Sequence, residues 1–286
     1  MTSRNIRSSV LLLGLIALTA CSDDKPSQTQ FVPANETKTA ATETPPDPTL
    51  PLAAAVEANH AETHWSYAGP GAPEHWSELK SEFATCATGT HQSPIDISGV
   101  TVAEQPGLKV EYKDAPLTVA NNGHTIQVNY PAGSALSVNG KDYPLVQFHF
   151  HSPSEHTLGG KTSAMVAHLV HKSADGELAV IESRLDVGAD HALISKLWQH
   201  LPTAGQQVES PETIVNARDL LPDNLSRYFS YDGSLTTPPC SEGVKWFVLA
   251  ETSEVGRTQV DTFLNLFPLN ARPVQPINGR SVVANN

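Results

Sequence analysis

Apolar and polar residues alternate in short segments through much of the chain after residue 107, and many of the apolar positions are β-branched. This period of two is typical of half-buried β-strands. Turn signals separate several of the segments, at Asn122-Gly123, Asn139-Gly140 and Asp232-Gly233. The pattern predicts strands over residues 108–112, 117–120, 125–130, 145–151, 165–170, 178–185 and 245–250.

Two later segments have the patterns of short helices. Asp190 and Thr258 are placed to cap helices over residues 192–201 and 260–267. A proline follows each of them, at Pro202 and Pro268. No internal repeat is found, so residues 60–286 are predicted to form one domain that is mainly β or α+β, with small peripheral helices.

The segment before residue 60 has a different character. Residues 1–20 place two arginines ahead of an apolar run, residues 10–20, that is far shorter than the roughly 20 residues a membrane span requires. This predicts a signal peptide. The run ends in Leu-Thr-Ala-Cys, which resembles the lipobox of bacterial lipoproteins and implies lipidation of Cys21. Cleavage at an ordinary signal-peptidase site is the alternative, but Leu18 stands where that site favours a small residue.

Residues 21–59 are polar and rich in proline, so we expect a disordered tether between the lipidated cysteine and the domain. The lipobox resemblance implies a bacterial cell envelope location, anchored by the lipid alone and with the outer membrane as destination. The domain would then be periplasmic or surface-exposed. The formal net charge of −12 and the absence of a basic run argue against a nucleic-acid partner.

The chain has three cysteines. If Cys21 is lipidated, Cys86 and Cys240 remain as an even pair in an oxidising compartment, which predicts a disulfide between them. Two unrelated buried thiols are the alternative.

The candidate chemistry begins with His149 and His151. Side chains two apart in a strand project to the same face, and imidazole is a favoured zinc ligand. A catalytic zinc takes three protein ligands, and a further predicted strand offers His168 or His171 as the third. Those two residues point to opposite faces, and their spacing does not choose between them. The alternative for all four histidines is that they bind no metal and that each ring faces solvent or is hydrogen-bonded to the backbone in the interior.

Several motifs occur in order along the chain: the His64-Trp65 and Tyr67 entry, Gln92-Ser93-Pro94-Ile95-Asp96-Ile97, Asn122-Gly123-His124, residues 147–157, Ala167-His168-Leu169-Val170-His171, Ser234-Leu235-Thr236-Thr237-Pro238-Pro239, and Asn270 through Gln275-Pro276. Together they make residues 65–280 resemble an α-class carbonic anhydrase of the bacterial type. The resemblance implies a large, mostly antiparallel mixed β-sheet. It also implies a zinc enzyme (Zn²⁺ cofactor) that reversibly hydrates carbon dioxide to bicarbonate and a proton through zinc-bound hydroxide.

The resemblance assigns roles by position. It implies zinc ligation by His149, His151 and His168, with Gln147 supporting His149. Thr236 and Glu155 would orient the zinc hydroxide, because an ionised carboxylate can only accept a hydrogen bond and forces the threonine to donate to it. The remaining implied residues are a carbon dioxide wall of Val170, Val180, Leu235 and Trp246 with Thr237 nearby, the proton shuttle His124, and a water network at Tyr67, Asn121 and Gln127. Without the resemblance, these are ordinary core, turn and surface positions.

Two positions depart from the family pattern. Val166 stands two residues before the third ligand, where the family carries a glutamate that orients it, so we expect weaker zinc binding or a carbonyl or water in its place. Glu182 and Arg184 lie in a predicted strand where relatives are apolar, and a local pair or partial exposure would be needed to accommodate them. These departures keep a second hypothesis open, namely a carbonic-anhydrase-like envelope binding module with weak or no catalysis.

Overall fold

The computed structural model describes residues 64–285, so the predicted signal peptide, Cys21, the whole predicted tether and residues 60–63 of the predicted domain lie outside the described residues. In the described part, the helices are α1 (Trp76–Leu79), α2 (Thr85–Thr88), α3 (Ala192–Trp198) and α4 (Arg257–Leu266), with 3₁₀ turns at Gly69–Gly71, Pro73–His75, Ser81–Phe83 and Ala217–Leu220. The strands are β1 (Asp96–Ile97), β2 (Thr101–Val102), β3 (Lys109–Glu111), β4 (Ala115–Asn121), β5 (Ile126–Asn129), β6 (Ala135–Val138), β7 (Lys141–His151), β8 (Thr157–Leu158), β9 (Met165–Lys172), β10 (Leu178–Val187), β11 (Gln207–Val215), β12 (Tyr228–Ser234), β13 (Glu242–Leu249), β14 (Ser253–Val255) and β15 (Val283–Ala284).

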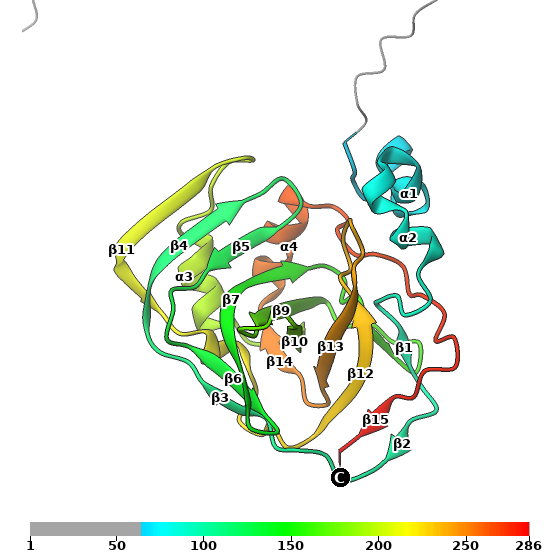
Figure 1. Cartoon of the computed structure of the whole chain (residues 1–286). Coiled ribbons are helices and arrows are strands. Elements are labelled where there is room, and N and C mark those ends of the chain that lie inside the picture. Colours follow the sequence, from blue (N-terminus) through cyan, green and yellow to red (C-terminus); the bar gives the residue numbers. More distant parts are fainter. Residues whose placement is uncertain (1–63, 286) are drawn as a thin grey trace, which may run out of the picture. The chain divides into compact units, whose positions relative to one another are not determined.

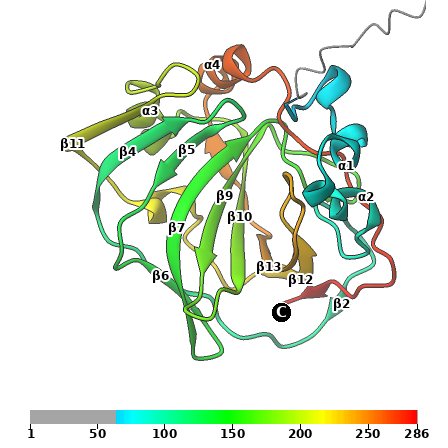
Figure 2. The ribbon, with the colours of Figure 1, turned by 45° about the horizontal axis from the view of Figure 1, so that its top comes forward.

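Most of these strands form one sheet, whose main path runs β11-β4-β5-β7-β9-β10-β13-β12-β15-β2 (Figure 2). The pairs from β11 to β10 are antiparallel, whereas β10 pairs with β13 in parallel. The small helices lie around this sheet (Figure 1). The predicted fold class, a mostly antiparallel mixed sheet with small peripheral helices, is confirmed.

The two faces of the central strands carry different contents. Phe148, Phe150 and Leu169 belong to the larger apolar cluster, which also contains Leu197 of α3 and Phe263 of α4. Because side chains alternate along a strand, the intervening residues of β7, β9 and β10 project to the opposite face. That face carries the histidines of interest and a second, smaller apolar cluster.

Several boundaries differ from the predictions. The cap of α3 is His191, whose ring accepts from the Ile194 amide, so Asp190 does not cap it, and the helix ends at Trp198. The cap of α4 is Gly256, so the helix begins ahead of Thr258. The Gln259 side chain accepts from the Gly256 amide at 2.9 Å and takes the place of a cap at Thr258.

The predicted turn at Asp232-Gly233 is also wrong, because both residues lie within β12. Gly233 serves a packing role there: a Cβ atom would stand 2.2 Å from the Ser93 hydroxyl and 2.8 Å from the Trp246 ring. The glycine therefore permits the close approach of Ser93, and it does not mark a reversal of the chain.

The predicted disulfide between Cys86 and Cys240 is present. It joins α2 to the segment that follows β12 and spans a sequence separation of 154 residues. Within residues 64–285, no helix has the length and apolar character needed to cross a membrane.

Candidate active site

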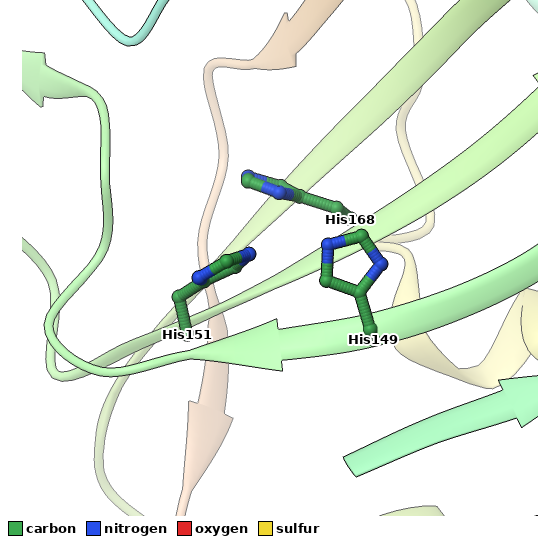
Figure 3. A group of neighbouring side chains, drawn as sticks. All are labelled: His149, His151 and His168. Atoms are coloured by element: carbon green, nitrogen blue, oxygen red, sulfur yellow. The ribbon is translucent and has the colours of Figure 1, made fainter. Parts of the chain in front are cut away.

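Three histidine side chains from two neighbouring strands meet on one face of the sheet. His149 and His151 project from β7, and His168 of β9 pairs directly with His149 in the antiparallel register. One nitrogen from each ring lies within 4.8 Å of the others. Figure 3 shows the three rings turned toward one shared space. The register of β7 and β9 thus assembles a cluster that could hold a metal ion.

The second ring nitrogen of each histidine has its own partner. His149 Nδ1 lies 2.9 Å from Gln147 Oε1, and His151 Nδ1 lies 2.6 Å from the Asn270 carbonyl oxygen. His168 Nε2 lies 3.0 Å from Glu182 Oε2. Oxygen acceptors at these positions place a hydrogen on the facing nitrogen. The other nitrogen of each ring then presents a lone pair to the shared space.

Two orphaned atoms show that a cation fits here. His151 Nε2 and Glu155 Oε2 are buried and have no hydrogen-bond partner among the described residues. Glu155 Oε2 lies 3.6 Å from His151 Nε2 and 3.7 Å from His168 Nδ1. Burial, and then the neighbouring histidines, lower the pKa of His149. Burial also lowers the pKa of His151, against the opposing effect of Glu155. Neutral imidazoles with unpartnered lone pairs are the donor set that zinc accepts.

His171, the other candidate for a third ligand, lies on the opposite side of β9. Its Nε2 lies 2.7 Å from the Tyr112 hydroxyl and its Nδ1 lies 3.2 Å from the Ala179 carbonyl oxygen. Burial lowers the pKa of His171 to about 4. The structure therefore places His168 in the cluster and gives His171 a packing role in the core.

The two departures from the family pattern explain each other. Val166 is fully buried and offers His168 no hydrogen bond, but Glu182 stands opposite His168 in the β9–β10 ladder and accepts from it. The expectation that a carbonyl or water replaces the missing glutamate is wrong, because a second carboxylate does so. Burial alone would raise the pKa of Glu182, but the interactions with His156 and His168 together have the larger effect, so the pKa of Glu182 is lowered.

Arg184 is buried as well, so partial exposure, one of the two alternatives for these charges, does not occur, and the other alternative is seen in the local pairing of Glu182 with His156 and His168. Its guanidinium donates to the Ala250 carbonyl oxygen at 3.0 Å. Burial lowers its pKa, and the negative charge of Glu182 opposes that shift.

Glu155 is fixed by the backbone of a distant segment. Its Oε1 accepts from the Arg272 amide at 2.8 Å. Its Oε2 has no hydrogen-bond partner, so the hydrogen bond expected from Thr236 is not made in this structure. Both side chains are buried nonetheless, with 2% exposure for Glu155 and 6% for Thr236.

A cavity of about 130 Å³ opens in front of the histidines. Its lining includes seven of the residues predicted for the site: Tyr67, His124, Gln127, Gln147, His149, His151 and Thr237. Asn121 does not line it: its side chain donates to the Pro202 carbonyl oxygen and accepts from the Gly123 amide. Asn122 lines the cavity instead, so the structure does not place Asn121 with the other residues predicted for the water network.

His124 stacks on an aromatic group at the edge of this cavity. Its ring lies 3.5 Å from that of Trp65, centroid to centroid, and the two are inclined by 9°. His64 stacks on it as well, at 5.1 Å. Burial, followed by the nearby His64, lowers the pKa of His124 from the ordinary value of 6.5 to about 4. In this position the ring is neutral at pH 7.

The residues predicted to form a carbon dioxide wall lie in one apolar group. Val180 and Trp246 belong to the smaller buried cluster, and Val170 and Leu235 pack against it. The Trp246 ring lies 5.0 Å from the His168 ring, centroid to centroid. The wall therefore adjoins the histidine cluster.

Sequence reasoning missed four groups that hold the site together: Asn270, His156, Tyr231 and Glu182. Asn270 accepts from His151 through its carbonyl oxygen and from the Ser152 amide through its side chain. Its place in a recognised motif was the available signal. Glu182 was noted as a charge in an apolar strand, which is the signal that a buried partner exists.

Comparison with known proteins agrees with this arrangement. The model of the family described as eukaryotic-type carbonic anhydrase matches residues 71–286. A carbonic anhydrase of Neisseria gonorrhoeae is 42% identical over 234 residues, covering 81% of this chain and 91% of that protein. One from Klebsiella pneumoniae is 42% identical over 224 residues, covering 77% of this chain and 91% of that protein.

Solved structures are similar too. A hyperthermostable carbonic anhydrase from a hydrothermal vent chimney has a TM-score of 0.76 and 45% identity, covering 78% of this chain and all of its own. The α-carbonic anhydrase of Photobacterium profundum has a TM-score of 0.73 and 43% identity, covering 77% of this chain and all of its own. The chain therefore belongs to the α-class carbonic anhydrase family.

Proposed function

We propose that this protein binds one zinc ion through His149, His151 and His168 and catalyses the reversible hydration of carbon dioxide. The observation that carries the proposal is the convergence of three imidazole nitrogens within 4.8 Å of one another, in a chain of this family. Zinc, when bound, supplies a Lewis acid that makes water a stronger acid and a better nucleophile at neutral pH.

The chain's own residues would prepare the reaction. Gln147, the Asn270 carbonyl and Glu182 hold the three ring orientations, because each fixes the nitrogen that does not face the shared space. Thr236 would donate its hydroxyl hydrogen to Glu155 and so keep lone pairs free to accept from the attacking water. That hydrogen bond is not made in this structure, and its formation is part of the proposal.

The substrate would rest against the apolar wall. Carbon dioxide carries no net charge and has no hydrogen to donate, so a surface of Val170, Val180, Leu235 and Trp246 suits it better than a polar one. The adjacent Thr237 lines the polar side of the cavity. Bicarbonate, which is charged, would leave through that side.

The proton released in each cycle would pass through His124. Tyr67, Gln127 and Asn122 line the cavity between the ligands and this ring, and can hold the intervening waters. In the stacked position the lowered pKa makes His124 a poor proton acceptor. The shuttle therefore requires the ring to leave Trp65 and gain contact with water, which returns its pKa toward the ordinary value.

A stopped-flow assay with a pH indicator tests the activity. Purified, zinc-loaded protein should hydrate carbon dioxide in an acetazolamide-sensitive way, and His149→Ala should abolish this activity. The alternative, a binding module with weak or no catalysis, rests on Val166 and on the charges of β10, and the hydrogen bond between Glu182 and His168 supports catalysis in preference to it. Absence of hydration by protein that retains stoichiometric zinc would favour the module.

Envelope anchoring is a separate part of the proposal. The lipobox-like segment ending at Cys21 and the proline-rich segment after it support lipidation and tethering to a bacterial envelope membrane. In a Gram-negative host, labelled palmitate should be incorporated by the wild type and not by Cys21→Ala. The variant should also move from the membrane fraction to the soluble fraction. Equal labelling of both would refute this part.

A further inference from the structure

We infer that the buried carboxylate of Glu182 is a positioning residue that orients His168 for the metal, supplied by β10 in place of the glutamate that β9 lacks. The inference rests on the proposed function, because it gives His168 a metal to bind. Glu182 stands directly across the β9–β10 ladder from His168. Glu182 is wholly buried and His168 is 1% exposed, so water does not compete for their contact.

The geometry sets the tautomer of His168. Glu182 Oε2 faces two ring nitrogens at once, His168 Nε2 at 3.0 Å and His156 Nδ1 at 2.5 Å. A carboxylate oxygen placed between two ring nitrogens accepts an N–H hydrogen from each. His168 then carries its hydrogen on Nε2. Its lone pair is on Nδ1, the nitrogen that faces Glu155 and the shared space.

A chain of hydrogen bonds holds Glu182 in turn. Once His156 donates to Glu182 from Nδ1, its Nε2 accepts from the Tyr231 hydroxyl at 2.5 Å. The Tyr231 oxygen then accepts from the Ser93 hydroxyl at 2.7 Å, and Ser93 accepts from the Ser234 amide at 3.0 Å. The direction of every bond follows from the donors available. The carboxylate cannot rotate away from His168 without breaking this chain.

The same residues do not form a second metal site, although His156, His168 and Glu182 are close enough to be considered one. Two ligands of a tetrahedral zinc ion, each about 2.0–2.2 Å from it, lie roughly 3.4 Å apart. Glu182 Oε2 approaches the two ring nitrogens to 2.5 and 3.0 Å, which are hydrogen-bond distances. These contacts leave no room for an ion among the three groups.

Zinc release provides a test that does not depend on turnover. Each full-length, zinc-loaded protein is mixed with excess chromogenic chelator at fixed pH, and the rate of zinc loss is measured. Both ring N–H groups donate to Oε2 of Glu182, and Oε1 has no hydrogen-bond partner among the described residues. Glu182→Gln keeps the size of the side chain and one oxygen acceptor, but it removes the negative charge that strengthens both hydrogen bonds. We expect it to release zinc about 10–100-fold faster than the wild type.

Three variants complete the series: Ser183→Ala, Val166→Glu/Glu182→Ala and Glu182→Ala alone. Ser183→Ala is the matched control, since Ser183 is the next buried residue of β10 and its hydroxyl donates to Leu220 on the other face. It should release zinc at the wild-type rate. Val166→Glu/Glu182→Ala moves the carboxylate to β9, two residues before His168 and on the same face, and should restore retention to within about threefold of the wild type. Equal rates of zinc release for Glu182→Gln and the wild type would overturn the inference. It would also be overturned if Val166→Glu/Glu182→Ala released zinc as fast as Glu182→Ala alone.

A measurement on the wild type keeps the inference testable if Glu182→Gln fails to fold. Histidine labelled with ¹⁵N reports the tautomer of each ring by NMR, and His168 should carry its hydrogen on Nε2, in slow exchange with water. A hydrogen on Nδ1 would overturn the inference. The zinc count of the wild type is separate: less than one zinc per chain would contradict the proposed function, whatever the tautomer.

Discussion

The Cys86–Cys240 disulfide should stabilise the fold and also steady one side of the active site. It closes a loop with a sequence separation of 154 residues. On the chain-entropy relation, a loop of that length corresponds to about 5 kcal/mol at 25 °C, and measured effects are often smaller. We therefore expect Cys86→Ser/Cys240→Ser to lower the free energy of unfolding by about 3–5 kcal/mol.

The same bridge anchors the segment that carries Thr236 and Thr237. The Cys240 amide donates to the Thr237 carbonyl oxygen at 2.8 Å, and the Gln92 side chain donates to the Cys240 carbonyl oxygen at 3.0 Å. The proposed metal ligands lie on β7 and β9, away from this segment in the sequence. Loss of the bridge should accordingly leave the zinc content at one per chain while it lowers kcat for hydration.

Urea unfolding followed by tryptophan fluorescence is the assay, with both proteins zinc-saturated and without reductant. Free energies must be compared rather than midpoints, because removing the cross-link expands the unfolded chain and raises the denaturant slope. Cys21→Ala is the control, since it removes a cysteine and leaves the bridge. A loss of less than about 1 kcal/mol in the double variant would refute the loop-entropy reasoning.

Three further predictions concern single side chains. His124→Ala should slow hydration in weak buffer and recover with added imidazole, and absence of recovery would count against the shuttle. His171→Gln should keep one zinc per chain, whereas His168→Ala should lose it. Because the pKa of His171 is lowered to about 4, the unfolded chain takes up its proton first as pH falls below about 6.5. The wild type should therefore lose up to about 3 kcal/mol relative to His171→Gln between pH 7 and pH 4, and parallel pH profiles would contradict this. Arg272→Met should lower the free energy of unfolding in urea by about 3 kcal/mol, because the guanidinium donates hydrogen bonds to oxygen atoms of Gln92, Ser93 and Cys86. An unchanged free energy of unfolding would contradict this.

The fold class could be predicted because period-two alternation directly reflects the two faces of a strand. Strand β4, for example, alternates buried and partly exposed residues along its length. Strand β11 escaped prediction because its residues are mostly polar and exposed, and a bulge interrupts its pairing with β4. The short strands β1, β8 and β15 have only two residues each, too few to show any period.

The part of the site that depends on residue spacing within one strand could be predicted from the sequence. Alternation places His149 and His151 on one face, but the choice between His168 and His171 depends on which face of β9 meets β7. Glu182 shows the limit most clearly. The sequence alone offers no reason for its charge in an apolar strand. The register of β9 and β10 sets Glu182 opposite His168, where it accepts a hydrogen bond from the ring. Asn121 and Asn122 are adjacent in sequence, and the path of the loop decides which one faces the cavity.

We propose that His149, His151 and His168 form a zinc-dependent carbonic anhydrase site. Metal content and acetazolamide-sensitive carbon dioxide hydration measured on one sample of the purified chain test it most directly. We expect one zinc per chain and rapid hydration, both lost in His149→Ala. A wild-type protein that holds one zinc and shows no hydration above background, or one that hydrates equally well after His149→Ala, would contradict the account.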